Sequence, residues 1–207
     1  TNLVELVSGF GIECIHTHHV SMEYFVADTI KKHLPSIHHV ANMHGMYEML
    51  SEDQFARNIA EIKKSVEHWF YPAEKNIKPF VDYGLFSDSK FTKVPNGISR
   101  QEINPIDRRE LGIDQKAFVI CLASRALPEK GWLEAIRMTG LARERTDRDI
   151  HLLLLGEGEI FDELLKQTLP DHVHLLGFKK NVMDYFAGSD VGLLPSYFKG
   201  ESYPLAI

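Results

Sequence analysis

The sequence predicts an α/β protein with parallel sheets, and three observations support this fold class. AFVICLA (117–123) and IHLLLLG (150–156) are almost continuous apolar runs, typical of strands that are buried on both faces of a parallel sheet. Segments with helical periodicity alternate with such runs. Glycine or proline closes several runs and marks the turns. We therefore expect doubly wound, Rossmann-like domains with right-handed crossovers.

The first 95 residues are predicted to form part of one such domain. The expected elements are a strand at 12–18, a helix at 22–33, a strand at 37–44, a helix at 51–72, a short helix and loop within 76–93, and a strand at 91–95. The first helix carries an apolar stripe of Met22, Phe25, Val26 and Ile30. Ser51 and Gln54 form a predicted capping box, from which apolar spacing continues to Trp69, and Pro72 ends that helix.

The second predicted domain covers residues 96–207 and lacks its last elements. Its expected elements are strands at 117–123, 150–156, 172–177 and 190–195, with helices at 131–145, 158–167 and 181–188 between them. Asn96 and Gly97 give the turn signal at which we place the boundary, so residues 1–95 form the partial N-terminal domain.

Composition narrows the functional class. The net charge of −6 argues against a nucleic-acid-binding protein, which needs a basic face. Cys14 and Cys121 both lie in apolar segments, so we expect buried free thiols in a reducing compartment. No apolar run is long enough to span a membrane, and the start has no signal-peptide pattern. The start without Met and the abrupt end lead us to expect a cytoplasmic fragment.

Arg125, Lys130 and Glu201 are the candidate ligand-binding residues. Each follows a predicted strand at its carboxyl end, where open parallel sheets bind ligands. Arg and Lys suit a diphosphate, and a carboxylate suits sugar hydroxyls. Gly131 and the helix after it would add backbone amides. The alternative is that all three are ordinary solvated loop residues.

Two further features are less specific. Gly156-Glu157-Gly158 joins a strand to a helix and permits close backbone contact with a ligand, although many such turns contain glycine. Seven of the eleven histidines fall within the first 45 residues. They lack a recognised metal spacing, so we expect core or cleft histidines and no metal site.

The ordered motifs VPNGI, SRALPEKG, LLLLGEGE, HLLGF, NVMDYFAGSDVGLLPS and GESYPLAI resemble the donor-binding half of retaining glycosyltransferases of family 4 (glycosyl transferases group 1). That family has the GT-B fold, with two Rossmann-like doubly wound domains. The resemblance covers residues 94–207 well and the N-terminal portion more loosely. It implies that the chain is truncated at both ends, holding the back half of the N-terminal domain and most of the C-terminal one.

The resemblance implies a role for individual residues. Arg125 and Lys130 would hold the donor diphosphate, Glu201 would bind the transferred sugar, and His44 would reach towards the reacting centre. The other residues that it implies in donor binding are Gly97, Gly156, Glu157, Phe178, Lys179, Ser202, Tyr203 and Pro204. Ser202 and Tyr203 stand where the family usually has Gly and Phe, a departure that would adjust sugar fit.

The implied function is transfer of a sugar, with retention, from a nucleotide-diphosphate sugar to an acceptor hydroxyl in polysaccharide or glycoconjugate biosynthesis. The acceptor would be a glycan, lipid-linked or small molecule. No cofactor or metal is implied, and the full-length protein would be cytoplasmic or peripheral to a membrane. A nucleotide-sugar epimerase of the same fold and a non-catalytic nucleotide- or glycan-binding module remain as alternatives.

Overall fold

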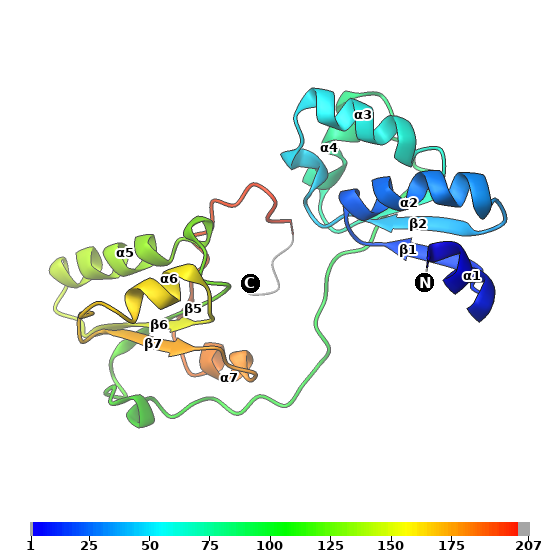
Figure 1. Ribbon diagram of the computed structural model, residues 1–207. Coiled ribbons are helices and arrows are strands. Elements are labelled where there is room, and N and C mark those ends of the chain that lie inside the picture. Colours follow the sequence, from blue (N-terminus) through cyan, green and yellow to red (C-terminus); the bar gives the residue numbers. More distant parts are fainter. Residues whose placement is uncertain (1, 203–207) are drawn as a thin grey trace. The chain divides into compact units, whose positions relative to one another are not determined.

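The computed structural model describes residues 2–202, which divide into two compact units (Figure 1). The first unit contains residues 2–97 and takes in the later segment 199–202. The second contains residues 98–198. Each unit is an α/β structure with its own parallel sheet of four strands, which confirms the predicted fold class.

The first unit has the sheet order β1-β2-β3-β4, so neighbouring strands follow one another along the chain. Its elements are α1 (Leu3–Phe10), β1 (Cys14–Thr17), α2 (Val20–His33), β2 (His38–Asn42), the 3-10 helix η1 (Tyr47–Met49), α3 (Glu52–Ile62), β3 (His68–Tyr71), α4 (Glu74–Asp82) and β4 (Phe91–Lys93). Ala41, Trp69 and Phe91 lie side by side on β2, β3 and β4 and belong to the core that α3 and α4 cover. The Trp69 and Phe91 rings stack with centroids 5.0 Å apart.

The prediction of one helix from 51 to 72 is wrong in its second half. The Ser51–Gln54 capping box is present, but α3 ends at Ile62 and residues 68–71 form β3. Trp69 continued the apolar spacing of the helix, yet β3 pairs with β2 on one side and β4 on the other. Because aromatic side chains suit a pleated sheet, this tertiary pairing overrides the local periodicity.

Two predicted burial patterns are also corrected. Met22 and Phe25 on α2 are 52% and 77% exposed, and the buried side of the helix contains Glu23 with Val26 and Ile30. The apolar spacing could not show this because the buried side includes an acidic residue. Cys14, at the start of β1, is exposed, whereas Cys121 is buried as expected.

The second unit has the sheet order β7-β6-β5-β8. Its elements are the 3-10 helix η2 (Arg108–Leu111), β5 (Phe118–Ala123), the 3-10 helix η3 (Pro128–Lys130), α5 (Trp132–Glu144), β6 (Ile150–Leu155), α6 (Glu159–Leu164), β7 (Val173–Gly177), α7 (Val182–Ala187) and β8 (Val191–Gly192). Leu152 and Leu154 face α5 and α6, while Leu153 and Leu155 face α7. Figure 1 shows α5 and α6 on one side of this sheet and α7 on the other.

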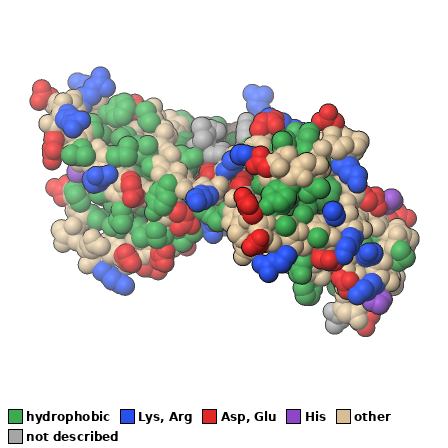
Figure 2. Space-filling model, turned by 90° about the horizontal axis from the view of Figure 1, so that it is seen from above, with side chains coloured by type: hydrophobic (Ala, Val, Ile, Leu, Met, Phe, Trp, Pro, Cys, Tyr) green, Lys and Arg blue, Asp and Glu red, His purple; other side chains and the backbone are tan. Residues whose placement is uncertain are grey.

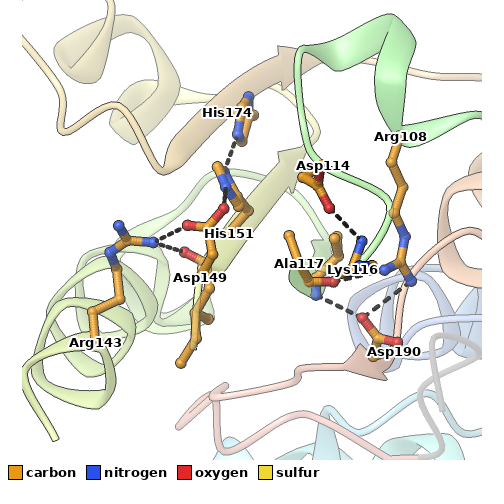
Figure 3. Close-up of polar contacts among 11 residues, drawn as sticks. Arg108, Asp114, Lys116, Ala117, Arg143, Asp149, His151, His174 and Asp190 are labelled. Carbon is orange, nitrogen blue, oxygen red and sulfur yellow. Dashed lines mark hydrogen bonds and ion pairs between the residues drawn. The ribbon is translucent and has the colours of Figure 1, made fainter. Parts of the chain in front are cut away.

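Polar contacts hold the amino ends of the strands of the second unit (Figure 3). Arg108 binds Asp190 at 3.0 Å and donates to the carbonyl of Ala117 at 2.7 Å. Asp149, next to β6, accepts from Arg143 at 2.8 Å and from His151 at 3.0 Å. These contacts lie at the opposite end of the strands from the predicted ligand site, so we assign them to the stability of the sheet.

The surface carries both signs of charge. On the face drawn in Figure 2, Lys and Arg side chains lie among Asp and Glu on both units, in keeping with the overall charge of −6. Among the described residues, no helix is long and apolar enough to cross a membrane.

Glu23 is a buried acid in the core of the first unit. Its side chain is 0% exposed, and the Tyr47 hydroxyl donates a hydrogen bond to one carboxyl oxygen. The other oxygen is buried and has no hydrogen-bond partner among the described residues. Burial raises the pKa of Glu23 to about 7, because a buried carboxylate loses its hydration.

This burial predicts that the first unit loses stability as the pH rises from about 4.5 to about 7. In that window Glu23 is ionised in the unfolded chain and protonated in the folded one, so rising pH favours unfolding. We expect a loss of roughly 3 kcal/mol, measured by urea unfolding at pH 5 and pH 8. Glu23→Gln should remove most of this loss. Glu52→Gln, at an exposed position, should keep it, and an equal pH response in the Glu23→Gln protein would contradict the prediction.

Candidate functional site

A cavity of about 530 Å³ opens at the carboxyl ends of β5 and β6 in the second unit. Its lining residues come from the last residues of β5 and β6, from the loops after β5, β6 and β7, and from α7: Ala123, Ser124, Arg125, Leu155, Gly156, Glu157, Phe178, Lys179, Val182, Met183 and Phe186. Five of the residues predicted to bind the donor are thus brought together. A cavity of this size holds a small ligand, and its position is where open α/β sheets bind theirs.

Direct contact between two loops shapes the cavity wall. Ala126 donates its amide proton to the carbonyl of Glu157 at 2.8 Å, and Ile160 donates to the carbonyl of Ala126 at 3.0 Å. Gly156 and Gly158 have φ values of +136° and +145°, and a Cβ at Gly158 would lie 2.6 Å from the Ala126 oxygen. Both glycines are therefore required by the packing of the chain against itself, in addition to any approach of a ligand.

Two cations line the cavity. Arg125 follows β5 directly, and its side chain is exposed. Lys179 is half-buried, with its ammonium 5.9 Å from the centre of the Tyr185 ring. Ser124, just before Arg125, accepts a hydrogen bond from the indole of Trp132 at 3.0 Å, which ties the end of β5 to the first residue of α5. The wall next to Arg125 is therefore held by a side-chain hydrogen bond, while the Arg125 side chain itself is exposed.

Lys130 does not line this cavity. It ends η3, is only 8% exposed, and its ammonium lies 4.9 Å from the centre of the Phe198 ring. Gly131, the residue just before α5, has φ +75°, and a Cβ there would lie 2.6 Å from the carbonyl oxygen of Pro195. The loop after β8 therefore packs closely on the start of α5. The sequence places Arg125 and Lys130 in one loop, but only Arg125 is among the residues that line the cavity.

None of the remaining predicted residues that the structure describes is among those lining this cavity. Gly97 is exposed in the irregular stretch between β4 and η2, and a Cβ there would meet no atom within 4 Å. Glu201 and Ser202 are half-buried and belong to the first unit. Tyr203 and Pro204 lie outside the described residues.

His44 belongs to a histidine cluster at the carboxyl ends of β1 and β2. Its Nε2 lies 3.0 Å from Nδ1 of His18, so one ring donates a hydrogen bond to the other, and the two rings stack. The His16 ring lies 4.2 Å from the His18 ring. Burial and the neighbouring histidines lower the pKa of His44, which favours the neutral form of its imidazole near pH 7. Among residues 2–202, no three His, Cys, Asp or Glu side chains are grouped to hold a metal.

Comparison with known proteins identifies the family. The model of the family described as glycosyl transferases group 1 matches residues 104–207, which is half of the chain. The chain belongs to the glycosyl transferases group 1 family.

Two curated relatives are similar to this group 1 chain over part of their length. The UDP-Gal:alpha-D-GlcNAc-diphosphoundecaprenol alpha-1,3-galactosyltransferase of Escherichia coli is 29% identical over 132 residues, which is 57% of this chain and 33% of that protein. The N-acetylgalactosamine-N,N'-diacetylbacillosaminyl-diphospho-undecaprenol 4-alpha-N-acetylgalactosaminyltransferase of Campylobacter jejuni is 29% identical over 131 residues, covering 61% of this chain and 34% of that protein. The chain thus spans about a third of the length of these relatives.

Solved structures share the fold. Anabaena HepE in complex with UDP-glucose superimposes with a TM-score of 0.70 at 18% identity, over 94% of this chain and 56% of that one. This likeness confirms the GT-B type of fold, with two parallel sheets in two α/β units.

Sequence reasoning missed several residues of this group 1 chain. Val182, Met183 and Phe186 contribute apolar side chains to the cavity from α7. Their spacing of three and four was visible in the sequence, but it indicated only a helix with one apolar side. His18 was part of the histidine-rich stretch, and only the pairing of β1 with β2 reveals its contact with His44.

The histidine contact predicts that His18→Ala raises the pKa of His44 towards that of a free imidazole. Removing His18 exposes His44 to water and takes away a neighbouring positive charge, and both changes favour the protonated ring. NMR titration of the ring nitrogens would measure the shift. His33→Ala, at an exposed position on α2, should leave the His44 midpoint in place. An unchanged midpoint in the His18→Ala protein would show that the contact does not form in solution.

Proposed function

We propose that the protein containing this chain is a retaining glycosyltransferase whose sugar donor is a uridine-diphosphate sugar. The main support is the cavity in the second unit, which joins Arg125 and Lys179 to the glycine-containing loop after β6 and to the apolar side chains of α7. Cations suit a diphosphate, and apolar walls suit a flat base. The similar Anabaena structure contains UDP-glucose, and the similar Escherichia coli enzyme is named for UDP-Gal.

In this proposal the chain provides charge and orientation. Arg125 and Lys130 hold the diphosphate and stabilise the negative charge that builds up on the departing nucleotide. The backbone around Gly156 and Glu157 and around Phe178 and Lys179 holds the nucleoside. Glu201 accepts hydrogen bonds from hydroxyls of the transferred sugar.

The proposed reaction takes place on one face of the sugar. The bond from the anomeric carbon to the diphosphate oxygen breaks, and the acceptor oxygen bonds to that carbon from the same side. The proton of the acceptor hydroxyl passes to the departing phosphate. His44 is proposed to lie near the reacting centre, and no protein nucleophile is required.

The proposed acceptor is a saccharide on a lipid diphosphate. Both curated relatives are named for transfer to diphosphoundecaprenol-linked sugars. Such an acceptor would place the enzyme at a membrane surface in the assembly of a polysaccharide or glycoconjugate.

A transfer assay tests this function. Purified full-length protein would receive UDP-glucose, UDP-galactose or their N-acetyl forms with an undecaprenyl-diphosphate saccharide, with and without EDTA. We expect one UDP-sugar to give a product whose anomeric configuration, read by proton NMR, equals that of the donor. Binding of UDP without any transfer would favour the binding-module alternative, and an inverted product would contradict retention.

We expect Arg125→Ala to weaken UDP binding by about 10- to 100-fold, since a charge-assisted hydrogen bond contributes roughly 1.5–3 kcal/mol. Lys130→Ala should lower affinity to a similar extent. Isothermal titration calorimetry measures both. Arg137→Ala, an exposed position on α5, is the matched control and should bind UDP like the wild type. Wild-type affinity in the Arg125→Ala protein would remove this residue from the site.

Glu201→Ala should behave differently. Because the proposed role of Glu201 is to bind sugar hydroxyls, we expect UDP affinity to stay the same while affinity for the UDP-sugar falls by about tenfold, equivalent to roughly 1.4 kcal/mol. The two affinities would be measured side by side by calorimetry. A parallel loss for UDP and UDP-sugar would place Glu201 at the nucleotide instead.

A further inference from the structure

The segment carrying Glu201 is held by side chains of the first unit. Asn76, in the first turn of α4, donates from its amide nitrogen to the hydroxyl of Ser202 at 2.7 Å. Lys75 donates to the carbonyl of Lys199 at 3.0 Å. Both ends of the segment 199–202 are therefore attached to the start of α4, with Glu201 between them.

The buried side chain of Asn76 forms hydrogen bonds with three different partners. Its side chain is 0% exposed. The amide oxygen accepts from the backbone N–H of Ala73 at 3.0 Å, and the amide nitrogen also donates to a carboxylate oxygen of Glu48 at 2.8 Å. With Ser202 as the third partner, both N–H protons and the oxygen of the amide are used. A buried amide with fixed partners on three sides has a single orientation, so it can fix the position of what it binds.

Gly45 allows residues 199–202 to approach the loop after β2 closely. It follows His44 and has φ +82°, which favours glycine. A Cβ at this position would lie 2.5 Å from the Ser202 hydroxyl oxygen and 2.8 Å from the carbonyl carbon of Gly200. Gly45 is therefore required both by its backbone conformation and by the space that the segment occupies.

From these contacts we infer that Asn76 is a positioning residue that fixes the Glu201 segment through the hydroxyl of Ser202. This inference rests on the proposed function, in which Glu201 selects the sugar. It also gives a role to Ser202, which stands where the family usually has glycine. A glycine at position 202 would offer no hydroxyl to Asn76, whereas Ser202 does. Asn76 and Gly45 then set where Glu201 is held without touching the donor themselves.

The first test is structural and needs no ligand. Hydrogen–deuterium exchange in the full-length protein would follow the backbone amides of residues 200–202. We expect Ser202→Ala and Asn76→Ala each to speed their exchange by about 2- to 10-fold, the range that the loss of one hydrogen bond gives. The Asn76→Ala, Ser202→Ala double variant should exchange no faster than Asn76→Ala alone. Ser202→Ala leaves the cap of α4 intact, so it remains informative if Asn76→Ala fails to fold.

A glycine pair provides a matched control. Gly45→Ala and Gly84→Ala both place a side chain at positive φ, +82° and +64°, but a Cβ at Gly84 would meet no atom within 4 Å. The backbone strain is therefore shared, and only Gly45→Ala should release residues 200–202. Equal exchange of the segment in the two variants would overturn the role of Gly45.

The second test links the segment to the ligand. The ratio of UDP-glucose affinity to UDP affinity should fall in Ser202→Ala by the factor seen in exchange, with UDP affinity itself unchanged. Unaltered exchange in both Ser202→Ala and Asn76→Ala would overturn the inference, and so would faster exchange with an unaltered ratio. If the wild type bound neither nucleotide while exchange still rose, the proposed function would fail and the holding contact would stand.

Discussion

The candidate site depends on the close approach of two loops at the carboxyl ends of β5 and β6. Hydrogen bonds join Ala126 to Glu157 and Ile160, and they form only because Gly156 and Gly158 leave room for the carbonyls of the facing loop. A side chain at either glycine would push the loops apart. The wall of the cavity, the position of Arg125 and the start of α6 would all change with it. The apolar sheet supports the two loops, and the contact between the loops forms the wall of the cavity.

Stabilising contacts and candidate ligand-binding residues lie at opposite ends of the strands of the second unit. In the second unit the strands are fastened at their amino ends by Arg108 and Asp190, away from the cavity. The carboxyl ends therefore remain available for polar groups that face a ligand. In the first unit the corresponding edge carries His44, His18 and Gly45. The core there tolerates a buried acid, Glu23, because Tyr47 supplies one hydrogen bond and burial raises the pKa of the carboxyl to about 7.

Membership of the group 1 family rests on residues 104–207, whereas the residues proposed to position Glu201 belong to the first unit. Asn76 and Gly45 were not singled out as site residues in the sequence, since an asparagine near a helix start and a glycine after a strand are common. Their contacts with residues 199–202 arise between segments more than 120 residues apart. Such contacts depend on how the chain folds back, and a local motif does not contain that information.

The sequence by itself determined the α/β class, most strands and helices, and the loop positions of Arg125, Gly156, Glu157 and Lys179. These follow from apolar runs, helical periodicity and turn residues, which act over a few neighbours. Only the tertiary structure decided that Trp69 belongs to a strand, that Glu23 is buried, and that Lys130 is not among the residues that line the cavity. Each of these depends on which distant segment supplies the neighbouring hydrogen bonds and apolar surface. Periodicity cannot distinguish a helix from a strand when that neighbour is unknown.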